Sequence, residues 1–78
     1  MSKAARAAHH LAMGAEFPYD GRKKRCDPAT LAARGILSDL MDRRGIKHEL
    51  EGIEDGAIRR EIVDAAAEII RQAFEAKP

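Results

Sequence analysis

Four consecutive cations, Arg22-Lys23-Lys24-Arg25, form the stretch whose residue types and spacing most clearly predict binding chemistry. Arginine and lysine side chains grouped in this way contact phosphates or the carboxylates of an acidic protein surface. Aromatic residues just upstream can plug one end of a core or give a partner exposed contact area. A merely solvated loop is the alternative, but we expect partner binding through six side chains: Phe17, Tyr19, Arg22, Lys23, Lys24 and Arg25.

The remaining chemically versatile residues form weaker patterns. His9 and His10 are neighbours, so on a helix they point about 100° apart and are poorly arranged to chelate one ion. We expect a solvated pair, since a metal site would need Cys26 or His48 brought close by the fold. His48 has no nucleophile at a recognisable spacing. The sequence therefore predicts a non-enzymatic protein without a catalytic, metal or cofactor site.

Charge is distributed unevenly along the chain, although the formal net charge is only +1. Residues 1–26 carry six basic and two acidic side chains, a net of +4, and residues 27–78 carry eight basic and eleven acidic ones, a net of −3. The two parts should attract each other or an outside partner. The pI near 8.0 is below that of a dedicated nucleic-acid binder.

The single cysteine, Cys26, cannot form an internal disulfide, and no stretch has the pattern of a secretory signal or a membrane span. These two features predict a cytoplasmic, reducing location and no membrane partner.

Helical periodicity is clearest over residues 55–75, around which we expect the chain to fold. The expected core stripe of this helix consists of Ile58, Ile62, Ala65, Ala66, Ile69 and Ala73. Its whole apolar arc spans roughly 200°, more than one neighbouring helix covers. A chain of 78 residues has marginal stability on its own. We therefore predict self-association as a homodimer through a second apolar seam made of Val63, Ile70 and Phe74.

Shorter periodic segments complete an all-α fold. We expect one domain, residues 1–78, built as a small bundle of three to four helices at about 3–13, 28–43, 46–51 and 55–75, with residues 14–27 as a loop. Ser2 and Asp27 are the expected N-caps of the first two helices. Gly35 suggests close packing within the second helix, and Gly45 is its expected C-cap. The expected buried stripe of that helix is Ala29, Ala33, Ile36, Leu37 and Leu40, and the short 46–51 helix should lie across the main pair.

Two segments, DLMDRRGIKHELEGI over residues 39–53 and REIVDAAAEIIRQAF over residues 60–74, resemble small uncharacterised helical proteins encoded by phages, prophages and other mobile elements of proteobacteria. The resemblance covers about half of the chain and assigns no functional residue. It implies a short protein that binds and blocks a host machine, as anti-CRISPR proteins do.

Three functions compete at this point. The leading one is a non-enzymatic inhibitor that uses the aromatic and basic loop to bind a protein complex with an acidic or nucleic-acid-binding surface. An accessory nucleic-acid binder would contact phosphates with the same loop. A helical dimerisation module would need only its self-association seam.

Overall fold

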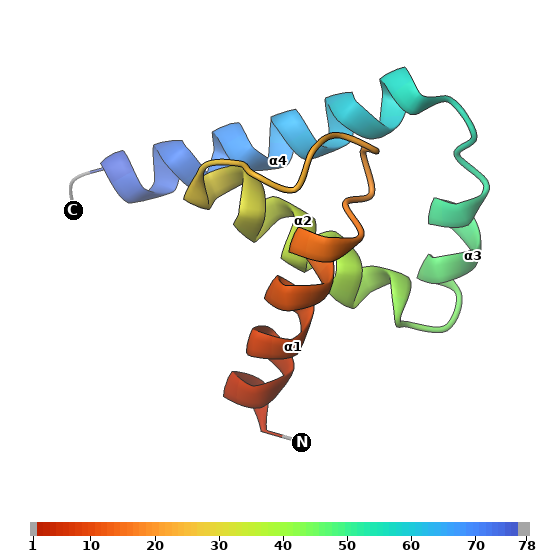
Figure 1. Ribbon diagram of the computed structural model, residues 1–78, viewed down its shortest axis with the longest axis horizontal. Helices are drawn as coiled ribbons and strands as arrows, with labels where there is room; N and C mark the ends of the chain where they lie inside the picture. The colour runs from red at the N-terminus through yellow and green to blue at the C-terminus, as the bar shows by residue number, and fades with distance from the viewer. Residues whose placement is uncertain (1, 77–78) are drawn as a thin grey trace.

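The structure, a computed structural model, describes residues 2–76 and within them contains four α-helices and no strand (Figure 1). This confirms the all-α prediction. The helices are α1 (Lys3–Glu16), α2 (Pro28–Met41), α3 (Ile46–Glu51) and α4 (Gly56–Glu75).

Helix α2 is the centre of the fold. It contacts α1, α3 and α4, and these three make no close backbone contact with one another within residues 2–76. Figure 1 shows α4 along the top, α1 descending from α2, and α3 standing apart at the far end. The prediction that the 46–51 helix lies across the main pair is therefore wrong, because α3 packs on α2 alone.

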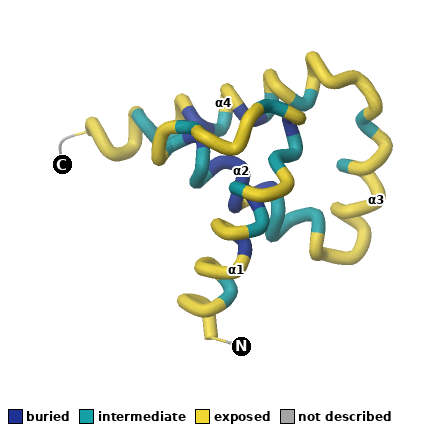
Figure 2. The backbone as a smooth tube through the Cα atoms, in the orientation of Figure 1, coloured by how far each residue is buried: buried dark blue, intermediate teal, exposed yellow. Residues whose placement is uncertain are grey.

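The core lies between α2 and α4, where Figure 2 shows much of the buried backbone. Its fully buried hydrophobic residues are Ala33 and Leu37 of α2 and Val63 and Ala67 of α4. Ile36, expected in the buried stripe, is instead 52% exposed. The reason is that α4 passes over Ala33 and Leu37, which leaves Ile36 to one side.

On α4 the expected core stripe and the expected self-association seam have largely changed places. Val63 is 0% exposed and Ile70 packs against the same core, so the prediction that they face a second chain is wrong. Ile58 and Ile69, predicted for the core, are exposed, as is Phe74 at 89%. Helix α2 meets only one side of the wide apolar arc, the side formed by Val63, Ala67 and Ile70.

Helix α1 crosses α2 at two glycines. A Cβ added to Gly14 would lie 2.9 Å from the backbone of Arg34 and Gly35, and one added to Gly35 would lie 3.1 Å from Leu11. The close packing predicted at Gly35 is thus confirmed. Gly14 continues α1 to Glu16 instead of ending it, so the connection to α2 is shorter than the predicted 14–27 loop.

Helix ends follow the sequence closely, with one correction. The backbone N–H of Ala5 donates to the Ser2 hydroxyl at 3.1 Å, so the predicted N-cap is confirmed. Helix α2 ends at Met41 with Asp42 as its C-cap, two residues before the expected end. Gly45 has the positive φ of 91° that its cap role required, but it precedes α3 as the N-cap residue.

Candidate partner-binding site

A buried arginine, Arg34 of α2, organises the loop that carries the four cations. Its side chain is only 2% exposed. One terminal nitrogen, Nη1, donates to the backbone oxygens of Lys23 at 3.1 Å and Lys24 at 3.4 Å, and lies 3.3 Å from Cys26 Sγ. The loop therefore wraps around a guanidinium group and is held through its main chain.

Asp20 neutralises this guanidinium from the other side. Its carboxylate is fully buried and accepts hydrogen bonds from Arg34 Nη2 at 3.1 and 3.3 Å. Burial by itself would raise the pKa of Asp20, but hydrogen bonds from Arg22 and the charges of Arg34 and Arg22 outweigh it and lower that pKa. Asp20 is thus an ionised acid inside the protein, and it depends on its two arginines.

Arg22 fastens the loop to α4. Its guanidinium binds the Asp20 carboxylate and also donates to Asp64 of α4 at 2.8 Å. Arg22 is one of the four cations predicted to bind a partner; in the structure its guanidinium is instead used in ion pairs within the chain.

A second ion pair ties the C-terminal end of the loop to α4. Arg71 of α4 donates to the Asp27 carboxylate at 2.8 Å, and the Thr30 hydroxyl donates to the same side chain. The hydrogen bond from Thr30 and then that from Arg71 lower the pKa of Asp27 to about 2. The loop is therefore tied to α4 at its middle, through Arg22, and at its C-terminal end, through Asp27, and the residues between these two points are held on both sides.

Lys23, Lys24 and Arg25 are exposed, and within residues 2–76 they make no ion pair. We call these three residues the basic platform. Lys23 and Arg25 border a shallow hollow of about 520 Å³ whose lining also includes Gly21, Arg22, Cys26, Thr30 and Arg34. The platform therefore presents free cations on a backbone that is already fixed.

The two loop aromatics have different surroundings. The Tyr19 hydroxyl donates to the Leu50 carbonyl at 3.1 Å, its ring packs against the core, and Arg59 lies 5.2 Å from the ring centroid. Tyr19 thus plugs one end of the core, the first of the two roles considered for it. Phe17 is 70% exposed and remains accessible to a partner.

The histidine pair is not evenly solvated, which corrects the expectation for His10. His9 is exposed, whereas His10 is buried, with Nδ1 2.9 Å from Ser38 Oγ and Nε2 3.5 Å from Asp39. The close crossing of α1 and α2 encloses the ring. Among the described residues there is no group of three or more His, Cys, Asp or Glu side chains placed to hold a metal ion.

Sequence reasoning missed Arg34 and Asp20. A usable signal existed, because Arg34 is the only cation between Pro28 and Met41 and is flanked by Ala33 and Gly35. A charged residue among small ones on a buried helix requires an opposite charge, and the nearest acid in the preceding loop is Asp20, apart from the N-cap.

Comparison of the chain with known proteins found no matching family model, no matching curated protein and no matching solved structure. In the part of the chain that the structure describes, no helix combines the length and hydropathy needed to cross a membrane.

Proposed function

We propose that this protein is a non-enzymatic interaction protein that binds an acidic patch on a macromolecular partner through the basic platform and blocks that partner. The supporting observation is the wrapping of the loop around Arg34, which holds the backbone of Lys23 and Lys24 in place before any partner arrives. A preformed loop loses little conformational entropy on binding, so more of the contact energy contributes to affinity. Phe17, at the start of the same loop, is exposed and offers an additional apolar contact.

The charge surrounding the platform favours a protein partner. Helix α4, to which the loop is tied, exposes four acidic side chains: Asp64 and Glu68, which are paired with Arg22 and Arg71, and Glu61 and Glu75, which have no ion pair within residues 2–76. A nucleic-acid backbone running beyond the platform would be repelled by these carboxylates, whereas a compact acidic patch on a protein would not reach all of them. The phage-type inhibitor expected from the sequence resemblance is the specific form of this proposal.

The test is affinity capture from a proteobacterial lysate with the 78-residue chain as bait, compared between two charge-matched variants. One carries Lys23→Ala, Lys24→Ala and Arg25→Ala; the other carries Arg44→Ala, Lys47→Ala and Arg60→Ala, which removes three exposed cations elsewhere. We expect a defined complex with the wild type and the second variant that is lost with the first. Equal capture by both variants would contradict the proposal.

Accessory nucleic-acid binding is the second candidate, and the hollow between Lys23 and Arg25 favours it, because cations around a depression can surround a phosphate. Electrophoretic mobility of short duplex DNA and single-stranded RNA separates the two functions. Retardation at low salt that falls steeply with added salt, and that the platform variant abolishes, would select this candidate. No retardation at low salt would exclude it.

A further inference from the structure

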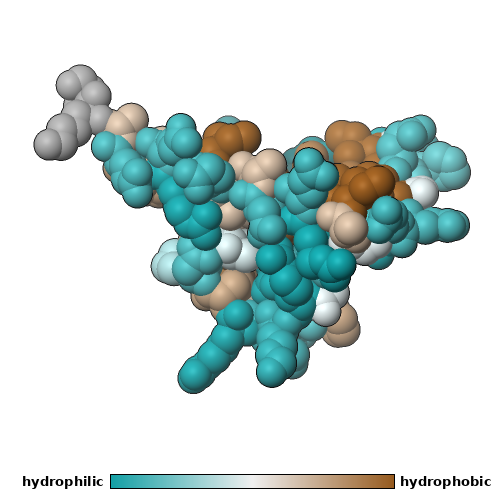
Figure 3. Space-filling model, turned by 90° about the horizontal axis from the view of Figure 1, so that it is seen from above, coloured by the Kyte–Doolittle hydropathy of each residue, from teal (hydrophilic) through white to brown (hydrophobic). Residues whose placement is uncertain are grey.

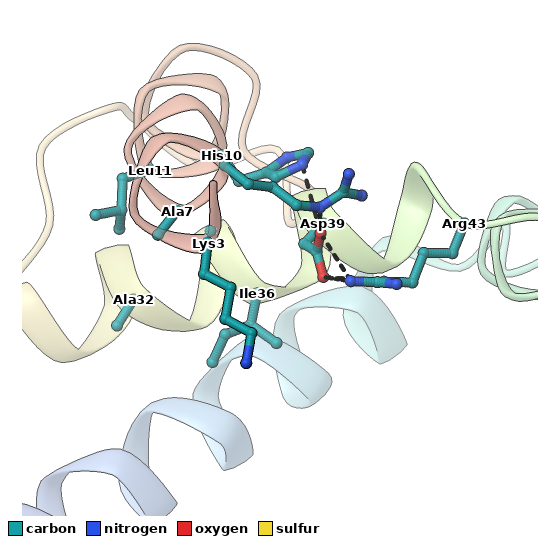
Figure 4. A pocket seen from close by; sticks show the side chains of 10 residues that line it. Lys3, Ala7, His10, Leu11, Ala32, Ile36, Asp39 and Arg43 are labelled. Carbon is teal, nitrogen blue, oxygen red and sulfur yellow. Dashed lines mark hydrogen bonds and ion pairs between the residues drawn. The ribbon is translucent and has the colours of Figure 1, made fainter. Parts of the chain in front are cut away.

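A groove lies between α1 and α2. Figure 4 shows Ala7 and Leu11 on its α1 side and Ala32 and Ile36 on its α2 side. The groove has a volume of about 480 Å³, and its lining is mostly apolar. Its charged lining is three cations, Lys3, Arg6 and Arg43, and one acid, Asp39.

An exposed apolar stripe runs along α4. At 100° per residue, its residues fall within an arc of about 80°, centred roughly 120° from Val63. Ile58 is 46% exposed and Ile69 70% exposed, and Glu61 and Glu68 lie at the solvent edge of the arc. We call this set the α4 stripe: Ile58, Ala65, Ile69 and Ala73, which are exposed, together with Ile62, which is half-buried because it also packs against the core.

The groove and the α4 stripe both point away from the basic platform. Ile36 is two positions after Arg34, which faces the loop, so the two side chains leave α2 on opposite sides. Ile69 is likewise two positions before Arg71, which binds the loop at Asp27. Figure 3, seen from above, shows apolar patches toward one long edge and projecting hydrophilic side chains on the other.

The exposed area of the chain is larger than that of a self-sufficient monomer. The chain exposes 5851 Å², whereas a folded monomer of 8.6 kDa exposes about 4,700 Å². The radius of gyration of 12.6 Å likewise exceeds the roughly 11.5 Å expected for this length. The excess of about 1,100 Å² is slightly more than the roughly 800 Å² that each partner buries in a standard interface.

The thin core indicates which partner covers this area. Within residues 2–76 only Val63 is a large side chain with less than 2% exposure, so the fold needs more apolar burial in every molecule. A second copy is the one partner that is always present. The charges agree, because the acidic edge of the α4 stripe complements the cationic rim of the groove.

We propose that this face is a homodimer interface in which the α4 stripe of each chain lies on the groove of the other. Because stripe and groove share one face, a single twofold axis brings both pairs together and closes the assembly. Leu11 and Ile36 would then contact Ile58 and Ile69 of the second copy. The basic platforms remain free on the outside.

Sedimentation equilibrium of the full chain tests this proposal. We expect twice the chain mass of 8.6 kDa at micromolar concentration. Ile69→Glu and Ile36→Glu should each weaken association at least about tenfold, because each places a charge in an apolar contact. Phe74→Glu is the matched control, since Phe74 is more exposed than either and lies outside the stripe and groove; it should leave the dimer intact.

A charge exchange keeps the test decisive if an apolar variant fails to fold. Glu61→Lys with Glu68→Lys reverses the stripe edge, and Lys3→Glu with Arg43→Glu reverses the groove rim. Each double variant should be monomeric alone, and the two should form a heterodimer when mixed, because both contacts then become complementary again. A monomeric wild type, no pairing in the mixture, or dissociation by Phe74→Glu but not by Ile69→Glu would overturn the proposal.

Discussion

Two faces of this protein differ in how many of their side chains find partners within the chain. We call them the loop face, which carries residues 17–27, and the groove face, which carries the groove between α1 and α2 and the α4 stripe. On the loop face, Arg22, Arg34 and Arg71 bind Asp20, Asp27 and Asp64, and these ion pairs hold the loop beneath the three cations of the basic platform. On the groove face, Leu11, Ile36 and Ile69 are large apolar side chains left exposed. Ion pairs and hydrogen bonds thus hold the loop in place, whereas the apolar side chains of the groove face are not covered by the chain.

This difference follows from the directionality of the two interactions. A buried ion pair stabilises only when donors and acceptors meet at hydrogen-bond distance, so the loop has one permitted arrangement. Apolar burial depends on area rather than direction, so an uncovered groove can accept a complementary surface without reorganising. A fixed loop suits selective recognition, and an apolar face suits stable association.

The largest expected effect comes from breaking the centre of the loop face. Arg34→Met should lower the free energy of unfolding by about 3–5 kcal/mol, because it removes the buried counter-ion of the Asp20 carboxylate and leaves only the half-exposed Arg22 beside it. Chemical denaturation followed by circular dichroism measures this. Asp20→Asn combined with Arg34→Met is the control and should be less destabilised than Arg34→Met alone. If the double variant were the less stable of the two, the counter-ion account would be wrong.

Acid should lower the free energy of unfolding through the carboxylates of the loop face, and we expect this effect to be smaller than that of Arg34→Met. The pKa of Asp27 is about 2 in the folded chain and near 3.8 without its partners, so between these values the native carboxylate is ionised while the unfolded one is protonated. Unfolding then takes up a proton, and the free energy of unfolding falls as the pH falls from about 4 to 2. The lowered pKa of Asp20 acts in the same direction. Urea denaturation across this range should show a shallower decline for Asp27→Asn than for the wild type; equal slopes would rule out this contribution.

The smallest effect is expected on the basic platform itself. Lys23→Ala, Lys24→Ala and Arg25→Ala together should change the free energy of unfolding by less than about 0.5 kcal/mol, because these side chains are exposed and Arg34 holds backbone atoms. Thermal unfolding of this variant beside the Arg44, Lys47 and Arg60 control measures it. A large loss confined to the platform variant would show that these side chains hold the loop and are not simply available to a partner.

Periodicity and capping rules predict the helices of this chain well. All four helices form within a few residues of their expected bounds, Ser2 caps α1, and Gly35 marks a close crossing. These features depend on residues near in sequence. Gly14 shows the limit, because a glycine is equally compatible with a helix end and a helix contact, and only the position of α2 decides.

The faces were harder to predict for a physical reason. A helical wheel gives the width of the apolar arc on α4 but not the sector that α2 contacts. For this reason the sequence places Ile69 in the core and Val63 at a self-association seam, whereas Val63 is buried and Ile69 is exposed. The pairing of Asp20 with Arg34 joins a helix to a loop that has no periodicity from which to predict it. In the sequence nothing distinguishes Arg22 from the three cations that follow it; only its ion pair with Asp64 in the folded chain does. Both errors concern contacts between elements rather than the elements themselves.

The hydrogen bonds from Arg34 to main-chain oxygens have an evolutionary consequence. Every amino acid has the same carbonyl group, so substitutions at positions 23 and 24 leave these bonds in place. Mutation can therefore vary the charge and size presented there, one codon at a time, while the scaffold persists. A surface built in this way can change its charge and shape through point substitutions alone.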